Sequence, residues 1–435
     1  MRLRDEATGP QRLVYDLLAA ALAAVDPYAA VRRALERAPL PADARVYAVG
    51  AGKAGAGMAR AAHDVLGERI IAGCVALPWK DAPPAIGRIV LASSGHPVPD
   101  ARGVAAAERV AELAQSAQSD DVVLCLFTGG GSALLPLPVA GVSLEDKQSV
   151  TGLLLRGGAT IHEVNAVRKH LSRLKGGQLA RLASRARVRG LYISDVPGDR
   201  LESVASGPTS PDSTTYADAL RVLERYGLLA QAPRAVVERL RLGLAGGAPE
   251  TPKGDEPFWA RVHNVIVASG GDGLDAARRR AEALGLRVHV LPELSGEARE
   301  VGARLGALVR RIARDGSPVA RPACVLAAGE TTVVVRGAGR GGRNQEVALA
   351  AAVEMDGLDG AALASFATDG VDGPTDAAGA MVDGATLARA RSRGLAPDRY
   401  LADNDAYSFF EGVGGLIRTG PTGTNVADIV VAVVE

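Results

Sequence analysis

The stretch RVYAVGAGKAGAGMARA, residues 45–61, decides the fold class. An apolar run, a glycine-rich turn and an alanine-rich segment follow one another, which predicts a buried strand, a tight turn and a helix. Gly50, Gly52 and Gly55 match the G-x-G-x-x-G spacing, in which backbone N–H groups approach an anion at the start of a helix. The stretch therefore predicts a strand–turn–helix unit with an anion site at the turn.

The chemistry of this turn differs from that of a dinucleotide site. Such a site places an acidic residue about 20 positions later, at the end of the second strand, whereas residues 70–78 read IIAGCVALP. Lys53 lies inside the turn and supplies a point charge that suits a phosphate or a carboxylate. The alternative is a turn whose glycines serve only helix–strand packing, with Lys53 on the surface.

Short apolar runs that end in Gly, Ser or Asp recur along the N-terminal half of the chain. Ala- and Leu-rich helical stretches separate most of them, and an amphipathic helix is expected over 11–38. The runs lie at 45–49, 70–77, 88–93, 121–127 and 189–194. Nearly continuous apolar strands that alternate with helices predict an α/β fold, with a parallel sheet covered on both faces.

A length of 435 residues predicts two domains. The stretch 240–257, rich in Gly, Pro and charge, is the expected linker, and 263–269 begins a second strand–helix–strand series. That series continues through a helix at 298–314 to the segment VLAAGETTVVVRG at 325–337. We therefore expect domains over 1–250 and 258–435, both α/β, with a cleft between them.

Composition and charge narrow the class of partner. The net charge is +1, with 50 Lys and Arg against 49 Asp and Glu, which gives no support for binding nucleic acid or a membrane surface. Three distant Cys predict neither a disulfide framework nor a structural zinc. The first residues carry acids where a signal peptide would be apolar, and no apolar run reaches transmembrane length. A cytoplasmic protein that acts on small molecules is expected, and a homodimer is left open.

A second glycine turn, LFTGGGSALL at 126–135, follows a buried strand. Gly129, Gly130, Gly131 and Ser132 leave backbone donors free to cradle phosphate oxygens. No G-x-x-x-x-G-K-[ST] occurs in the chain, so this is not a Walker P-loop. A purely structural glycine run is the alternative.

Two other segments supply polar groups near the same strand ends. SSGHPVPD at 93–100 offers Ser94 and His96, although His96 could simply satisfy loop carbonyls. The expected helix NAVRKHLSRLKGGQLA at 165–180 carries Asn165, and places Arg168, Ser172 and Lys175 on one face. That face is either an anion site or a solvated basic surface.

Carboxylates and an arginine-rich loop provide the remaining candidate site residues. Asp195 ends a strand in YISDVPGD (192–199), and Asp369 does so in FATDGVDGPTDAAGAMVDG (366–384). Such carboxylates suit Mg²⁺ or the acceptance of a proton from a hydroxyl, although turn chemistry also favours Asp. In AAGETTVVVRGAGRGGRNQEVALA (327–350), Arg343, Asn344 and Glu346 lie where a loop meets a helix. An arginine there could neutralise charge on a transferring phosphoryl group.

Donor-rich glycine turns with scattered carboxylates, Lys and Arg form the set that phosphoryl transfer requires. The segments GAGKAGAGMA, SSGHPVPD, FTGGGSALL, NAVRKHLSRLKGGQLA, SDVPGD and ASGPTSPD, followed by GETTVVVRGAGRGGRNQE and ATDGVDGPTDAAGA, resemble the glycerate 2-kinase family. The last two resemble its C-terminal MOFRL domain, at about 320–430. The resemblance runs from about residue 10 to the C-terminus.

The resemblance implies an N-terminal Rossmann-like domain, a C-terminal α/β domain and an active site in the cleft. It also implies that ATP and D-glycerate give 2-phosphoglycerate and ADP, with Mg²⁺ or another divalent cation. Lys53 would be the catalytic lysine and Arg343 the conserved-loop arginine.

The remaining roles follow as hypotheses. Gly52, the Gly129–Ser132 turn and the polar residues named above would hold the nucleotide or the acid, and the sequence does not decide which loop holds which. Asp195 would be the general base or a metal ligand, with Asp369 as the rival. Two other functions stay open: an NAD(P)H-dependent hydroxypyruvate reductase, and a non-catalytic sensor of sugar acids or nucleotides.

Overall fold

The computed structural model describes residues 8–78 and 83–435. It divides the chain into two compact units. The first unit is Pro27–Val267, and the second joins the segment up to Asp26 to Ala268–Glu435. The sequence placed the boundary between 250 and 258 and assigned the N-terminal segment to the first domain, so both limits differ. The predicted active site between the domains stays a prediction.

In the described residues, the first unit is built on a seven-stranded sheet of order β3-β4-β2-β1-β5-β6-β7. The strands are β1 (Val46–Ala51), β2 (Ile70–Leu77), β3 (Ala85–Ile86), β4 (Ile89–Ser93), β5 (Val122–Phe127), β6 (Arg187–Ile193) and β7 (Val262–Ala268). The pairs from β4 to β6 are parallel, and only the short β3 runs antiparallel to its neighbour β4 among the pairings described. The predicted parallel sheet is confirmed.

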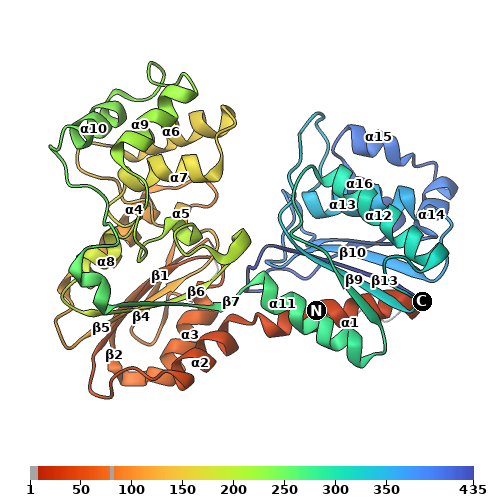
Figure 1. The fold of residues 1–435 in the computed structure, drawn as a ribbon, viewed down its shortest axis with the longest axis horizontal. Helices are drawn as coiled ribbons and strands as arrows, with labels where there is room; N and C mark the ends of the chain where they lie inside the picture. Colours follow the sequence, from red (N-terminus) through yellow and green to blue (C-terminus); the bar gives the residue numbers. More distant parts are fainter. Residues whose placement is uncertain (1–7, 79–82) are drawn as a thin grey trace. The chain divides into compact units, whose positions relative to one another are not determined.

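Helices cover both faces of this sheet (Figure 1). The helices α2 (Pro27–Arg37) and α3 (Gly55–Leu66) pack on one another, and α3 contacts β2 and β5. On the other face, α4 (Ala101–Ser116) and α8 (Gln178–Leu182) share an apolar cluster with alternate residues of β1 and β5. Because both faces are buried, the strands read as continuous apolar runs in the sequence.

A group of helices in the first unit forms a separate cap with its own apolar cluster. It contains α6 (Leu144–Arg156), α7 (Ile161–His170), α9 (Tyr216–Arg225) and α10 (Arg234–Leu244), seen together in Figure 1. The short α5 (Gly131–Leu134) follows β5, and single turns of 3₁₀ helix lie at η1 (Gly67–Arg69), η2 (Pro197–Asp199), η3 (Val204–Ser206) and η4 (Pro257–Arg261). The sequence did not predict the cap as a separate layer.

The second unit holds a six-stranded sheet in the described residues, of order β12-β11-β10-β13-β9-β8. The strands are β8 (Arg287–Val290), β9 (Ala323–Gly329), β10 (Ala361–Ala367), β11 (Gly379–Asp383), β12 (Leu416–Ile417) and β13 (Asp428–Val434). Only β8 and β9 pair in parallel among these strands, and the other pairs are antiparallel. The unit is α/β, as expected, with a mixed sheet.

Alternate residues of β9 show how the second sheet is covered on both faces. Val325 and Ala327 join the cluster of α12 (Ala298–Asp315) and α13 (Arg343–Glu354). Cys324 and Leu326 join the cluster of α1 (Gly9–Ala24) and α11 (Gly270–Ala283), on the opposite face in Figure 1. The remaining helices are α14 (Thr386–Ser392), α15 (Pro397–Ala402) and α16 (Ala406–Val413).

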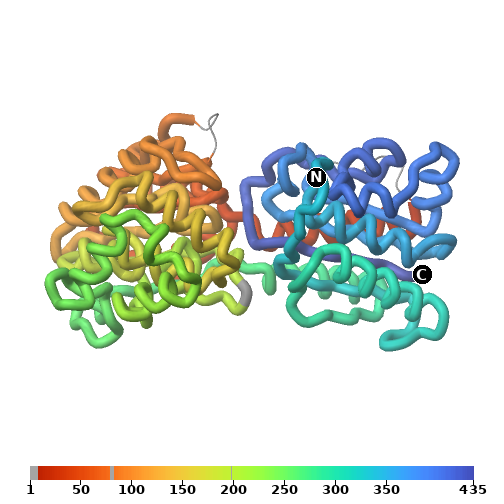
Figure 2. The backbone as a smooth tube through the Cα atoms, turned by 90° about the horizontal axis from the view of Figure 1, so that it is seen from above, coloured from red at the N-terminus to blue at the C-terminus, as the bar shows by residue number. Residues whose placement is uncertain are grey.

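The single helix predicted over 11–38 is wrong, because the chain breaks before Pro27 into α1 and α2. Figure 2 shows the red N-terminal segment running among the blue strands and helices of the second unit. There, Gln11 donates to Asp383 at 2.5 Å and Arg280 pairs with Asp16 at 2.6 Å. No single described helix is long and apolar enough to cross a membrane, whereas α1 and α2 as a bent pair meet that test by length and composition alone.

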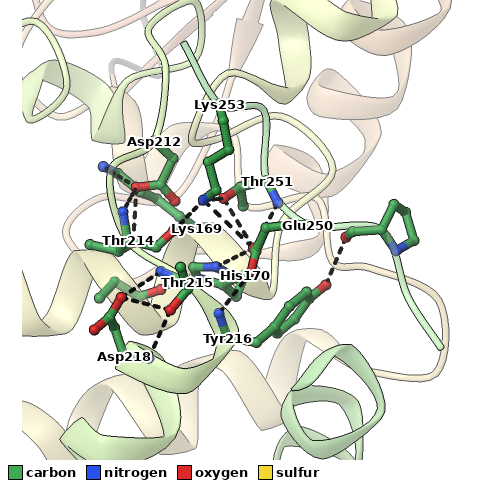
Figure 3. A network of polar contacts seen from close by, with 12 residues as sticks. Lys169, His170, Asp212, Thr214, Thr215, Tyr216, Asp218, Glu250, Thr251 and Lys253 are labelled. Atoms are coloured by element: carbon green, nitrogen blue, oxygen red, sulfur yellow. Dashed lines mark hydrogen bonds and ion pairs between the residues drawn. The ribbon is translucent and has the colours of Figure 1, made fainter. Parts of the chain in front are cut away.

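The predicted linker 240–257 is a fixed part of the first unit. Glu250 accepts a hydrogen bond from His170 at 2.8 Å and another from the backbone N–H of Tyr216 at 3.0 Å (Figure 3). Burial opposes ionisation of Glu250, but these donors outweigh it and lower its pKa to about 2. The segment then leads into β7 of the first sheet, so the Gly- and Pro-rich composition marks an anchored loop.

Candidate active site

The turn after β1 uses its glycines mainly for close packing. A Cβ on Gly50 would meet the backbone of Leu126 in β5, and one on Gly55 would meet side chains of β2. Gly52 has φ of 141° and a Cβ there would collide with Thr128. Strand and helix contacts therefore explain the G-x-G-x-x-G spacing, and it is no argument for a dinucleotide.

The two glycine turns meet at the place where an open α/β sheet commonly binds its ligand. From β1 the chain goes to β2 and β4 on one side of the sheet, and β5 and β6 lie on the other side. The crevice outside the carboxyl ends of β1 and β5 is the usual ligand position at such a switch point. The backbone N–H of Lys53 donates to the Gly129 carbonyl at 2.9 Å, which joins the two turns there.

Gly130 brings three predicted site residues together. Its φ of 88° lies in the left-handed region, where glycine is favoured. A Cβ at this position would lie 3.1 Å from Nε2 of His96 and 3.6 Å from Cγ of Lys53. Lys53, His96 and the glycine turn are thus neighbours, as expected for one site.

A short hydrogen-bond chain orients Ser132. The Ser206 hydroxyl donates to Oδ1 of Asn165 at 3.1 Å and lies 2.6 Å from the Ser132 hydroxyl. Because the single proton of Ser206 is used on Asn165, Ser132 is the donor in the second bond. Ser206 and Ala205 hold positive φ values of 61° and 51°, a backbone strain that often accompanies functional sites. Asn165 therefore acts on the turn through Ser206.

A pocket of about 450 Å³ opens beside this turn. It is bounded by the loops after β4 and β5, by α6 and α7, and by the turn after α7. Its lining contains His96, Pro97, Val98, Pro99, Gly130, Ser132, Ala133, Pro136, Lys147, Gln148, Thr151, Gly152, Leu155, Arg168 and Lys175. Five of the predicted site residues, from four separate segments, therefore line one pocket within the first unit.

Three cations line the pocket without a carboxylate partner. Lys147 donates to the Pro136 carbonyl and Lys175 to the Leu135 carbonyl, both at 2.6 Å. Among the described residues, no carboxylate lies within ion-pair distance of either lysine or of Arg168. Burial, followed by repulsion from Arg168, lowers the pKa of Lys175 to about 7. Burial, then Lys175 and Arg168, lowers the pKa of Lys147 well below its usual value.

Lys147 was missed by the sequence analysis. It lies on α6 at 7% exposure and is one of six Lys among 50 basic residues. A lysine kept in a chain that otherwise uses arginine was a signal that could have found it, because a compact ammonium is not interchangeable with a guanidinium.

The predicted helix over 165–180 is wrong, although Arg168 and Lys175 still meet. α7 ends at His170, and Gly176 and Gly177 then adopt positive φ. The Ser172 hydroxyl accepts the backbone N–H of Lys175 at 3.2 Å and so shapes this turn. The turn, and not a helical face, carries Lys175 into the pocket.

Lys169 is not part of the pocket lining and forms a buried ion pair with Asp212 at 3.2 Å (Figure 3). We expect Lys169→Met to lower the free energy of unfolding by about 3–5 kcal/mol, because it leaves a buried carboxylate without its cation. Urea denaturation measures the loss. The double variant Lys169→Met/Asp212→Asn should recover most of it, and a single variant as stable as the wild type would contradict the argument.

The other predicted residues of the first unit have different surroundings. Ser94 is buried and donates to the Leu134 carbonyl at 3.0 Å, so it ties the end of β4 to α5. Asp195 follows β6, is half-buried and is not part of the pocket lining. Its predicted role as base or metal ligand stays a prediction.

Arg343 begins α13 in the second unit, and its charge is held by two carboxylates there. Its Nε and Nη2 bind Asp428 at 2.6 and 3.1 Å, and Nη1 pairs with Glu330. Burial opposes the charge, but Asp428 outweighs it and raises the pKa of Arg343. Burial and the neighbouring Asp428 raise the pKa of Asp372 to about 6. Arg343 therefore stabilises a buried acidic cluster, whatever else it binds.

Asn344 and Glu346 are buried next to this cluster. Asn344 accepts from Ser365 at 2.6 Å, and its backbone N–H donates to Asp372 at 3.1 Å. Arg299 binds one oxygen of Glu346 at 2.8 Å, and Asn404 donates to the other at 3.1 Å. These contacts give both residues a structural role at the start of α13, and the predicted ligand contacts stay predictions.

The metal prediction named Asp195 and Asp369. They lie in different units, and Asp369 is buried and accepts the backbone N–H of Val371 at 3.0 Å. Within residues 8–78 and 83–435, no group of three or more His, Cys, Asp or Glu is arranged to hold a metal ion. Mg²⁺ in kinases is usually held by one or two carboxylates together with substrate phosphates. The chain thus supplies candidate ligands and no complete cage in the described residues.

Comparisons with known proteins extend over the whole chain. Residues 13–241 match a domain of unknown function (DUF4147), and residues 323–428 match the MOFRL family. A glycerate 2-kinase of Pyrococcus horikoshii is 41% identical over 96% of both chains. The crystal structure of a glycerate kinase from Thermotoga maritima is 40% identical, covers 98% of this chain and 99% of its own, and superposes with a TM-score of 0.88.

A relative from Agrobacterium vitis, 43% identical over 96% of this chain and 92% of its own, carries a provisional hydroxypyruvate reductase name. The kinase-named relatives match over comparable lengths, and the glycine turn described above gives no support for a dinucleotide. On full-length identity and shared fold, the chain belongs to the glycerate 2-kinase family.

Proposed function

We propose that the protein transfers the γ-phosphoryl group of ATP to the 2-hydroxyl of D-glycerate, giving 2-phosphoglycerate and ADP. The observation that carries the proposal is that Lys53 lies beside Gly130, next to a pocket whose three basic side chains have no carboxylate partner among the described residues. Phosphoryl transfer depends on positioning and charge neutralisation, and these groups supply both.

The roles of the residues follow from their positions. Lys53 neutralises charge that develops on the transferred phosphoryl group, because it lies beside Gly130 at the switch point. Backbone N–H groups of the Gly129–Ser132 turn bind phosphate oxygens, while the Ser132 hydroxyl is held by Ser206. Asp195 takes the proton of the 2-hydroxyl. Arg343, from the second unit, contributes charge to the phosphoryl group or the glycerate carboxylate.

A divalent cation, Mg²⁺ by preference, belongs to the proposal as a partner of the nucleotide. It supplies charge neutralisation at the phosphate oxygens when bound. Asp195 and Asp369 are the residues of this chain that would bind it. Titrating the protein with MnCl₂ and following the paramagnetic relaxation of water tests this with and without ADP.

A net charge of +1 favours small-molecule substrates over nucleic acid or a membrane surface. We place the enzyme in the cytoplasm and allow for a homodimer. Cell fractionation and light scattering on the purified protein test these two points.

Two assays on the purified protein test the activity. ADP release that requires both ATP and D-glycerate is expected, with no oxidation of NADH or NADPH by hydroxypyruvate. Phosphorus NMR of the product should show 2-phosphoglycerate. Nicotinamide oxidation in the absence of ATP would favour the reductase, ligand binding without turnover the sensor, and 3-phosphoglycerate would overturn the proposed position of transfer.

A further inference from the structure

The pocket in the first unit holds more basic groups than the single carboxylate of the acid substrate can pair with. Lys147, Arg168 and Lys175 line it, and none has a carboxylate within ion-pair distance among the described residues. D-Glycerate brings a single carboxylate, whereas one phosphate monoester group brings a charge of about −1.5 to −2. Buried cations without a partner are costly, so a ligand with several negative charges is the natural complement.

The arrangement of these cations suits phosphate oxygens. The ammonium group of Lys147 donates to the Pro136 carbonyl, and that of Lys175 donates to the Leu135 carbonyl. These two carbonyls are neighbours in the chain, a few residues after the glycine turn. Both residues line the pocket and are buried, at 7% and 3% exposure. Gly130 and Ser132 line the same pocket, which adds the backbone of the glycine turn to the three basic side chains.

The more exposed part of the pocket lining is apolar. Val98 and Leu155 line the pocket at 65% and 56% exposure, with Pro97 and Pro99 beside Val98. Exposed apolar side chains together with buried basic groups in one pocket fit a ligand that has a phosphate end and a less polar end, as a nucleotide does. A volume of about 450 Å³ also exceeds what a three-carbon acid fills.

We infer that this pocket is the phosphate subsite of the enzyme, in which Lys147, Arg168 and Lys175 bind the phosphate groups of a nucleotide or of the phosphorylated acid. The carboxylate of free glycerate binds elsewhere. Lys53 lies next to the subsite, beside Gly130, where the group in transfer would pass. The inference extends the proposed function, but it concerns binding and can be tested without turnover.

Titration calorimetry with Lys147→Met provides the first test. ADP, 2-phosphoglycerate and D-glycerate are titrated separately, without the other substrate. We expect the affinity for ADP, and for 2-phosphoglycerate if the product shares the subsite, to fall about 10- to 100-fold, the usual effect of losing one charged hydrogen bond. Glycerate affinity should not change. If only the affinity for ADP falls, the subsite binds the nucleotide. If only the affinity for 2-phosphoglycerate falls, it binds the product.

The matched control is Arg173→Met, which removes one positive charge from an exposed position on the turn after α7. It should change each affinity less than twofold. Lys147→Met should melt at the same temperature as the wild type or higher, because it removes a buried cation that lacks a carboxylate. Equal losses in both variants, or no loss in Lys147→Met, would overturn the inference.

The pH dependence of ADP binding tests the inference in the unaltered protein. Lys147 from α6, Arg168 from α7 and His96 from the loop after β4 line the pocket with Lys175. The pKa of Lys175 is about 7 in the free protein, so above pH 7 binding a polyanion must recruit a proton. The dissociation constant should rise about tenfold per pH unit between pH 8 and 9. The phosphate itself, with its second pKa near about 6, no longer titrates there.

Lys175→Met should bind ADP more weakly and with a shallower slope, which would then come from Lys147, whose pKa is also lowered. A flat pH profile in the wild type would contradict the inference even if every variant failed to fold. The proposed function and the proposed phosphate subsite can also be refuted independently of each other. ADP binding that depends on Lys147 without glycerate phosphorylation would sink the proposed function alone, whereas phosphorylation with a pH-independent ADP affinity would sink the subsite alone.

Discussion

Lys53→Met is expected to lower kcat for glycerate phosphorylation by about 10²–10³, with a smaller change in the affinity for ADP. Removal of one preorganised group that stabilises charge in a transition state usually has an effect of this size. Lys53 is held by the hydrogen bond from its backbone to Gly129, so the methionine side chain should occupy the same place without the charge. A continuous ADP-release assay at saturating ATP and glycerate measures the loss.

The control for this variant is Arg60→Met, an exposed position on the helix α3 that follows the turn. It removes the same charge and should keep at least half of the activity. Lys53→Arg should recover only part of kcat, because a guanidinium cannot place its charge where a compact ammonium does. A folded Lys53→Met protein with unchanged turnover would remove Lys53 from the chemistry.

The sequence predicted the first sheet and the place of its glycine turns because the signals there are local. Five apolar runs bounded by Gly, Ser or Asp became β1, β2, β4, β5 and β6, and no limit shifted by more than two residues. Parallel strands bring their carboxyl ends to one edge, so Lys53 and the Gly129–Ser132 turn had to be neighbours. What lay within one strand–turn–helix unit could therefore be derived.

The predictions that failed concern features that are determined by contacts between residues far apart in the sequence. The periodicity over 11–38 is amphipathic throughout, but Pro27 ends one helix, and α1 packs on the second sheet through contacts with β13 and α11 that no local pattern encodes. In 165–180, α7 already ends at His170, before the Gly176–Gly177 pair, and the basic pattern gave no sign of this break. Lys147 joins the pocket only because the cap folds over the turn after β5, and its own neighbourhood on α6 looks like an ordinary helix start.

Arg343→Met is expected to lower the free energy of unfolding by about 3–5 kcal/mol, the usual result when a buried ion pair loses one partner. Asp428 is 4% exposed in its side chain and would keep a buried charge beside Asp372. Burial already raises the pKa of Asp428 despite the arginine, and the loss of Arg343 should raise it further. A carboxyl group with a raised pKa in the folded state destabilises the fold when ionised, so the loss should be larger at pH 8 than at pH 5. Urea denaturation at both pH values measures it.

Activity alone cannot reveal the role of Arg343, because the single variant would be inactive through instability as well as through chemistry. Arg343→Met/Asp428→Asn removes the cation and the charge that it balances, in a side chain of the same shape, and should recover most of the lost stability. If Arg343 acts on the phosphoryl group or the glycerate carboxylate, the double variant stays at least 10²-fold less active although it is folded. If turnover returns with stability, Arg343 serves only to balance the acids at the start of α13, and the positive charge for catalysis must then come from Lys53 and the pocket of the first unit.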